Sequence, residues 1–247
     1  IQPYGLHALP SLYLLNSNQI LRFLFAFERE TFQRDRRNKF DEVIDLSTRK
    51  FRHHTTWQIQ DEIRLFDKRL TLTPTIQQEL YIDRFNSQDS LFQNTQTDPN
   101  KKTTQYTNYR MGLLGVIHKN KENTFSFKSN IARERRIPDF LELFGERGSV
   151  IGNLSLKPER SVNMDAGFVY DTVREKIKFT GSIAYFQKNI TDMILFVPNS
   201  QFTLRPENID SASIKGIEFT QNLTLFDKWK MESNYTYQKA INTSDTS

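Results

Sequence analysis

The 247-residue sequence combines many aromatic residues with few aliphatic ones. Aromatic side chains make up 13% of it and phenylalanine alone occurs 20 times, yet hydrophobic residues total only 37% and the mean hydropathy is −0.62. The length allows one or two globular domains. No apolar run approaches the roughly 18 residues of a membrane-spanning helix, which excludes a helical membrane protein.

The distribution of charge argues against a nucleic-acid partner. The 34 basic and 29 acidic residues leave a net charge of +5, but the two signs are interleaved. We therefore expect no dedicated nucleic-acid-binding stripe and no nucleic-acid partner. The absence of cysteine removes disulfides and thiolate metal sites. Because the sequence begins at Ile1 and ends in a polar tail, we expect it to be a section of a longer protein.

Period-2 alternation and turn chemistry predict about ten strands along the chain. Compact polar turns are expected at 16–19, 66–69, 118–123, 171–175 and 226–229. Long connections are expected between them, at 30–51, 83–107, 133–159 and 188–213. Strict alternation of short turns and long loops is typical of a meander closed through a membrane, because alternate strand ends face different compartments.

Segment 161–170 shows the clearest two-sided pattern. The residues Val162, Met164, Ala166, Phe168 and Tyr170 fall on one face, and smaller or polar residues fall on the other. We predict that Met164 and Phe168 contact lipid while Asn163 and Asp165 face a lumen. Alternation by itself also fits a soluble sheet. Expected strand lengths of about 10 to 14 residues favour a membrane barrel, whose strands need about 9 to 11 residues to cross.

Segment 133–159 is the most distinctive stretch. Its prolines and glycines prevent one uninterrupted helix or ladder strand, so it predicts a long ordered connection. It contains Arg136-Ile-Pro138, Glu142-Leu-Phe-Gly145 and Gly152-Asn-Leu-Ser-Leu-Lys-Pro-Glu159. This order and spacing resembles the sequence that TonB-dependent outer-membrane receptors carry between two barrel strands. The proline that usually follows the asparagine is Leu154 here. Residues 58–80 resemble a hairpin of the same family, and 215–218 resemble the start of one of its strands.

The resemblance implies an all-β protein in which residues 1–247 form part of a transmembrane barrel of about 22 antiparallel strands. It implies short periplasmic turns, long extracellular loops, and a plug domain and final strands that lie outside this sequence. The implied function is active import of a scarce large solute across the bacterial outer membrane, powered through TonB. A ferric siderophore or other iron complex is the favoured solute.

Other readings stay open beside this one. The same fold also serves cobalamin, haem and glycan import. Segment 133–159 lacks the histidine that haem receptors of the family tend to carry. A soluble all-β carbohydrate-binding module is the alternative from another class. Outer-membrane lipid and lipopolysaccharide are implied contacts of the barrel.

Candidate ligand-binding residues lie in segment 133–159. They are Arg133, Arg135, Arg136, Phe140, Phe144 and Arg147. Arginine forks suit an anionic ferric chelate, and the two phenylalanines suit stacking on a catecholate. The alternative is that the arginines pair with Glu134, Glu142 and Glu146, and that the rings pin the loop. A second basic run, residues 34–39, is either a lipopolysaccharide contact or an ordinary charged loop.

No catalytic motif appears, so we expect no enzyme and no cofactor. The four histidines provide one close pair, His53 and His54. Neighbouring residues on a strand point to opposite faces, so this pair does not predict a metal site.

Overall fold

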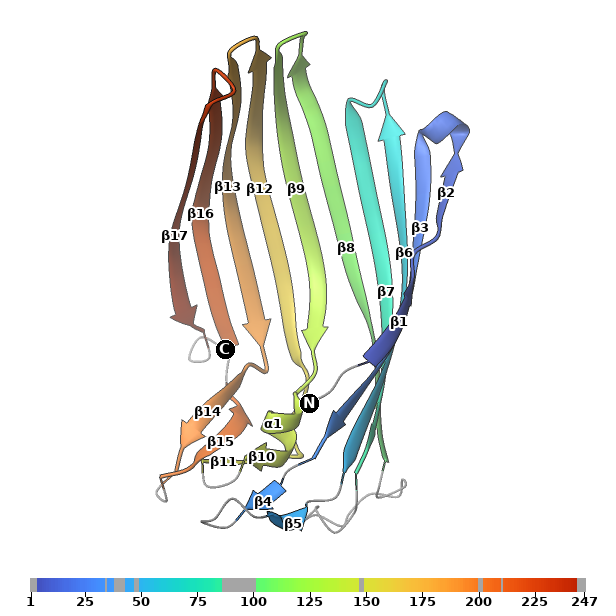
Figure 1. Ribbon diagram of the computed structural model, residues 1–247, viewed down its shortest axis with the longest axis vertical. Coiled ribbons are helices and arrows are strands. Elements are labelled where there is room, and N and C mark those ends of the chain that lie inside the picture. The colour runs from blue at the N-terminus through green and yellow to red at the C-terminus, as the bar shows by residue number, and fades with distance from the viewer. Residues whose placement is uncertain are drawn as a thin grey trace.

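The computed structural model describes residues 4–33, 35–37, 43–46, 49–85, 101–146, 149–199, 202–209 and 211–243. Most of them form one antiparallel sheet in the order β1-β3-β6-β7-β8-β9-β12-β13-β16-β17, with β2 also paired to β3 (Figure 1). The strands of this sheet are β1 (Tyr4–Ala8), β2 (Ser11–Leu14), β3 (Gln19–Phe32), β6 (Lys50–Leu65), β7 (Leu70–Arg84), β8 (Lys101–Lys119), β9 (Asn123–Arg136), β12 (Glu159–Arg174), β13 (Ile177–Thr191), β16 (Ser211–Leu225) and β17 (Trp229–Asn242). Because β1 and β2 share one edge of β3, the sheet has ten strand positions, as the sequence predicts.

The strands from β3 onward are long, between 14 and 19 residues. Each pairs with the neighbour that follows it in the large sheet, so the order is a simple meander. These lengths exceed the roughly 9 to 11 tilted residues that cross an apolar layer. The strands therefore continue beyond such a layer on at least one side.

All the short turns lie at one end of the sheet, at the top of Figure 1. Some of these turns contain left-handed residues, including Phe66 and Asp67 in one turn and Phe226 and Asp227 in another. Positive φ at two successive central residues matches the right-handed twist of the flanking strands. The near-identical Leu-Phe-Asp-Lys sequences at the two turns share the left-handed Phe-Asp pair but not the loop length, because Leu65 pairs with Leu70 whereas Leu225 pairs with Trp229. Lys178 donates to Asp227 at 2.8 Å and lowers the pKa of that carboxyl.

The long connections lie at the opposite end and carry small elements of their own. These are β4 (Asp35–Arg37), β5 (Val43–Leu46), α1 (Phe140–Phe144), β10 (Gly145–Glu146), β11 (Val150–Ile151), β14 (Ile194–Pro198) and β15 (Leu204–Asn208). The short 3-10 helix η1 (Leu15–Ser17) lies instead in the turn between β2 and β3. A small sheet in the order β10-β11-β15-β14 joins two of the connections. Its β11–β15 contact is parallel and brings residues 150 and 204 together.

All four long connections are shorter than predicted and one predicted turn is displaced, so these boundaries were wrong: β3 continues to Phe32, β7 to Arg84 and β13 to Thr191. The turn expected at 171–175 lies later, because β12 pairs with β13 as far as Arg174↔Ile177. The connection expected at 133–159 spans only 137–158, because β9 pairs with β12 as far as Arg136↔Glu159. In both places the strand pairing extends through charged residues, because its hydrogen bonds join backbone groups and do not depend on side-chain polarity.

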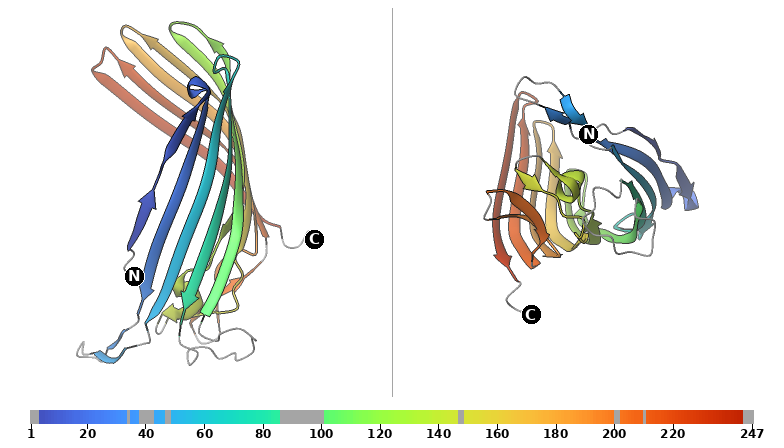
Figure 2. Two further views of the ribbon diagram at one scale, coloured as in Figure 1. Left: turned by 90° about the vertical axis from the view of Figure 1, so that its right-hand side faces the viewer. Right: turned by 90° about the horizontal axis from the view of Figure 1, so that it is seen from below.

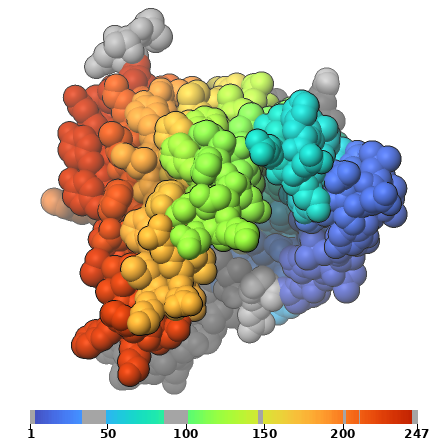
Figure 3. All heavy atoms as spheres, turned by 90° about the horizontal axis from the view of Figure 1, so that it is seen from above, coloured from blue at the N-terminus to red at the C-terminus, as the bar shows by residue number. Residues whose placement is uncertain are grey.

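The sheet curves strongly, and the folded connections lie inside the curve. Figure 2, seen from below, shows α1 and the small sheet within the arc of strands. From the opposite end the strands form an arc from the red residues of β17 to the blue residues of the first strands (Figure 3). None of the described helices is long and apolar enough to cross a membrane. Among the described residues, the compact apolar core lies in the connections, where Leu143, Leu156 and Ile194 pack together.

Candidate ligand-binding site at the inner face

The two faces of the sheet differ in chemistry. Met164 and Phe168 lie on the convex face with much of their side chains exposed, Phe168 at 43%. Asn163 and Asp165 point to the concave face, where Asn163 donates to Glu134 at 2.9 Å and Asp165 accepts from Asn130 at 3.0 Å. The predicted facing of these four residues agrees with this arrangement. A polar inner face and an apolar outer face are the arrangement of a membrane barrel wall.

A buried ion pair attaches the 137–158 connection to the inner face. Arg52 on β6 is only 4% exposed and donates to both carboxylate oxygens of Asp83 on β7, at 2.7 and 3.0 Å. The same guanidinium donates to the Pro138 carbonyl at 2.9 Å. Burial of an arginine is tolerated because its donors are paired in this fork geometry. Two strands and the start of the connection are thereby tied at one point.

An aromatic cluster fills the space next to this ion pair. Phe140 is 1% exposed, stacks against Phe32 at 5.5 Å, and lies 4.9 Å from the Arg52 guanidinium. Phe144 contacts Phe32 at 6.3 Å and Phe85 at 5.8 Å. The helix α1 therefore uses both rings to dock on the inner wall. This packing leaves Phe140 no free face for a ligand.

Arg136 holds the two ends of the connection together. Its guanidinium donates twice to Glu159 at 2.8 Å and twice to Glu142 at 3.0 Å. Glu142 also forms a capping box with Asp139, in which each side chain accepts from the other's backbone N–H. Glu159 accepts from the Ile194 N–H as well, at 2.7 Å. One arginine thus fixes the first turn of α1, the start of β12 and the start of β14.

The asparagine and glycines of the motif shape the rest of the connection. Asn153 donates its side-chain amide to the Pro206 carbonyl at 2.9 Å, and its backbone N–H to the Glu142 carbonyl at 2.9 Å. Gly145 has φ of +71°, which favours glycine. A Cβ at Gly152 would collide with the Leu143 carbonyl oxygen. The spacing of these glycines and the asparagine is therefore a folding requirement of this chain segment.

The remaining predicted site residues are dispersed. Arg133 belongs to β9 and lies on the outer face, at the level of Tyr109 and Val162. Arg135 is the next-but-one residue on the same strand, but the β8–β9 ladder ends at Arg133. The Arg135 guanidinium carbon lies 5.7 Å from the ring of Tyr106, which stacks with Tyr81 on the inner face. Arg147 lies outside the described residues, as do Arg34 and Lys39 of the second basic run. The five proposed residues that the structure describes therefore do not form one cluster.

The register of the strands builds an inner network that sequence reasoning missed. His54 stacks on Tyr81 with ring centres 4.0 Å apart, and the Tyr81 hydroxyl donates to Glu79 at 2.7 Å. His54 also lies 3.7 Å from Glu28, whose other oxygen is 3.5 Å from His7. These residues come from β1, β3, β6 and β7. Alternation within each strand places them on the inner face, but only the register brings them into one row.

The adjacent residues His53 and His54 point to opposite faces of the sheet, as their spacing predicts. His53 contacts the ring of Phe27 at 5.8 Å on the outer face, while His54 faces inward. Among the described residues, no group of three or more acidic, histidine or cysteine side chains has the geometry to hold a metal ion.

Long antiparallel strands, a polar inner face, an apolar outer face and folded connections at one end define a section of an outer-membrane β-barrel. Residues 13–247 match the family model described as "TonB dependent receptor-like, beta-barrel". The chain belongs to this family, and its place is the bacterial outer membrane. The soluble carbohydrate-binding alternative is therefore wrong. A search of curated proteins found no match.

Solved structures share the fold at low sequence identity. The copper transporter OprC superposes with a TM-score of 0.73 at 17% identity, covering 98% of this chain and 37% of that one. The FrpB iron transporter from Neisseria meningitidis gives 0.66 at 14% identity, with 97% and 36% covered. The Serratia marcescens hemophore receptor HasR gives 0.66 at 15% identity, with 96% and 41% covered. The chain thus spans well under half the length of these structures, which are receptors and transporters rather than enzymes.

Proposed function

We propose that this chain forms part of the wall and extracellular mouth of an active importer for an iron complex, with a ferric siderophore as the solute. TonB powers the importer through a plug domain seated in the barrel. The observation that carries the proposal is the 137–158 connection, which is folded over the inner face and fixed there by Arg52 and Arg136. A rigid connection in the mouth provides a preformed docking surface and lowers the entropy lost on capture.

Exposed basic groups on the inner wall support an anionic solute, although carboxylates such as Glu134 and Asp165 share that face. Register places Arg110, Lys128 and Lys188 on the inner face of β8, β9 and β13. All three side chains are exposed. Arg110 pairs with Glu134 at 2.6 Å, and its side chain is still 56% exposed. Exposed guanidinium and ammonium groups can form charge-assisted hydrogen bonds with an anionic chelate.

The contacts of the predicted site residues indicate which of them support the docking surface and which can contact the ligand. Arg136 and Phe140 are engaged within the protein, so we assign them to supporting the docking surface. Arg135 and the half-exposed edge of Phe144 remain as ligand contacts, together with Arg147. Arg133, on the outer face, is not assigned to this site.

The test is uptake by cells that lack the gene, with and without a plasmid copy. We expect loss of radiolabelled iron uptake from a ferric siderophore, no uptake in a strain without TonB, and expression that rises under iron starvation. Haem, cobalamin and copper salts are run in parallel. Restored uptake of one of these instead of the siderophore would overturn the choice of solute, and uptake independent of TonB would overturn the mechanism.

A further inference from the structure

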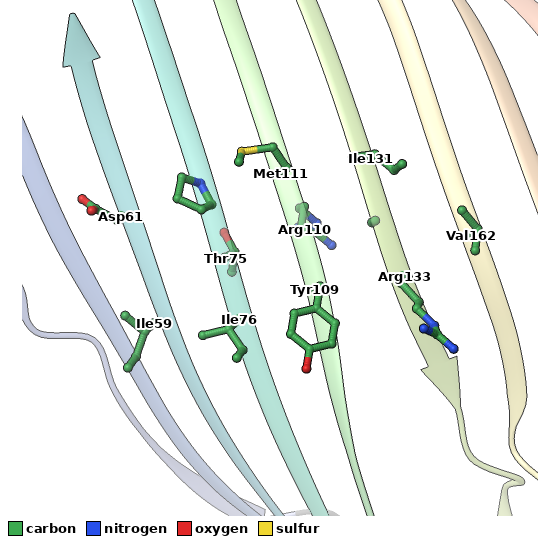
Figure 4. Close-up of a pocket in the computed structure, with 12 residues that line it drawn as sticks. Ile59, Asp61, Thr75, Ile76, Tyr109, Arg110, Met111, Ile131, Arg133 and Val162 are labelled. Atoms are coloured by element: carbon green, nitrogen blue, oxygen red, sulfur yellow. The ribbon is translucent and has the colours of Figure 1, made fainter.

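The outer face carries a hollow that the import function does not use. It is a trough of about 610 Å³ that crosses strands β6 to β12 between two rows of outward side chains (Figure 4). We call it the outer-face trough. Its apolar lining comes chiefly from Ile59, Ile76, Tyr109, Met111 and Ile131. All five are exposed, so in a membrane they face lipid.

An arginine lies at one end of this apolar surface. Arg133 lines the trough beside Tyr109 and Val162. Its side chain is exposed and makes no hydrogen bond or ion pair with any part of the chain that the structure describes. The trough therefore combines a hydrocarbon-like lining with one unpaired positive charge.

The position of Arg133 along its strand gives its depth in the membrane. It lies ten residues after Asn123, where β9 leaves its short turn. At about 3.3 Å per residue and a tilt of about 40°, this is a height of roughly 25 Å, the height of the apolar band of such barrels. Arg133 therefore reaches the extracellular edge of the band, where lipid headgroups begin. Ile59 lies only six residues from the end of β6 at its short turn, nearer the middle of the band.

The negative charge of Asp61, at the other end of the trough, determines the orientation of a bound lipid. Asp61 lines the trough on β6, where its carboxylate accepts from Gln19 at 2.8 Å. A carboxylate there repels an anionic headgroup, whereas the Arg133 guanidinium presents a fork that suits a phosphate. An occupant is thus oriented with its anionic head at Arg133 and its hydrocarbon part on the apolar lining.

We propose that the outer-face trough binds one phosphate-bearing anionic membrane lipid. Its phosphate pairs with Arg133 and one acyl chain lies over Met111, Ile131 and Ile76. This site is separate from the inner face and does not depend on which solute is imported.

The chain offers a matched control for the charge. Lys215 lies ten residues before Leu225, where β16 reaches its short turn, so it has the same height as Arg133. Register places it on the outer face opposite Gln187, and it does not line the trough. A general attraction of anionic lipid to surface cations would affect Arg133 and Lys215 equally.

The experiment is native mass spectrometry of the intact receptor in detergent, titrated with dioleoyl phosphatidylglycerol and, separately, with dioleoyl phosphatidylcholine. We expect Arg133→Gln to weaken binding of one phosphatidylglycerol about tenfold, the scale of one charge-assisted contact. Arg133→Lys should retain most of the binding, and Lys215→Gln should change it less than twofold. Phosphatidylcholine should bind more weakly and equally to all variants.

A second variant tests the apolar part of the trough. Val162→Trp keeps Arg133 but fills the hollow, so we expect it to weaken phosphatidylglycerol binding. Glycerol phosphate, which lacks acyl chains, should not compete with phosphatidylglycerol for the trough. Equal losses for Arg133→Gln and Lys215→Gln, or full binding by Val162→Trp, would overturn the proposal. Retention of the heat-dependent gel shift of a folded barrel identifies which variants are folded, and binding is compared among those.

Discussion

Single residues in this protein act through the face on which they lie. Asn163 and Phe168 belong to the same strand, yet one contacts carboxylates across the inner face and the other stacks with Phe125 on the outer face, at 5.5 Å. The physical meaning of a substitution therefore depends on parity along the strand. A charged substitution costs little folding stability at a lumen-facing position and much more at a lipid-facing one.

Arginine substitutions measure this difference directly. Phe168→Arg should reduce the free energy of unfolding in lipid vesicles by roughly 2 to 4 kcal/mol if the site is near the bilayer midplane. Asn163→Arg should cost little, because it faces the lumen beside Glu134. Denaturant titrations of the intact receptor in vesicles give both values. Equal losses would contradict the assigned faces.

Arg136 acts through the carboxylates it pairs rather than through exposure. Glu142 is buried, with 6% of its side chain exposed, and it loses its charge partner in Arg136→Ala. Leaving such a group unsatisfied costs roughly 1 to 3 kcal/mol. We expect faster amide hydrogen exchange at Glu142 and Leu143. Arg110→Ala is the control, since that pair is exposed and worth about 1 kcal/mol or less. Similar exchange in the two variants would mean that Arg136 does not hold the connection.

At the scale of elements, the 137–158 connection behaves as one small folded unit. It combines the capping box of α1, the Leu143 core and the small sheet shared with 194–208. Each part depends on close approach of backbone to backbone. Glycine at 145 and 152 permits that approach, and Asn153 then satisfies the carbonyl at Pro206.

Gly152→Ala should unfold this unit locally while leaving the wall intact. The new Cβ collides with backbone atoms of residues 143–145, so the connection must shift and the bond from Asn153 to Glu142 should break. We expect loss of exchange protection at Asn153 and weaker ligand capture. The matched control is Gly115→Ala on β8, where an added Cβ has open space. Protection at Asn153 equal to that of the unmodified protein would show that the connection tolerates the shift.

At the scale of the whole molecule, the sheet is curved but open. Its edges are β1 with β2 on one side and β17 on the other, and the described part of the chain provides no strand to join them. Open edges present unpaired N–H and C=O groups, and each costs several kcal/mol in hydrocarbon. The wall is therefore stable only when further strands close it.

Residues 1–247 expressed alone should aggregate or remain unfolded. Sedimentation and circular dichroism in detergent and in buffer report this outcome, and the same residues within the intact receptor serve as the positive control. A monomeric product that unfolds cooperatively in detergent-free buffer would contradict the open-edge argument.

The sequence by itself determined the strands, the alternation of short turns and long connections, and the two faces, because each depends on period-2 patterning or on turn residues close in the chain. It also identified 133–159 as a special segment through its prolines, glycines and family-like motif. Its boundaries and roles were less predictable, since Arg136 could equally bind a ligand or pair with Glu142 and Glu159.

Only the tertiary structure decided the inner network of Glu28, His54 and Glu79, the burial of Arg52 with Asp83, and the position of Arg133 on the outer face beside a trough. These arrangements depend on register and curvature, which bring together residues that are 24 or more positions apart in the sequence. Register is a collective property of paired backbones, and a one-residue slip would move every one of these side chains to the opposite face.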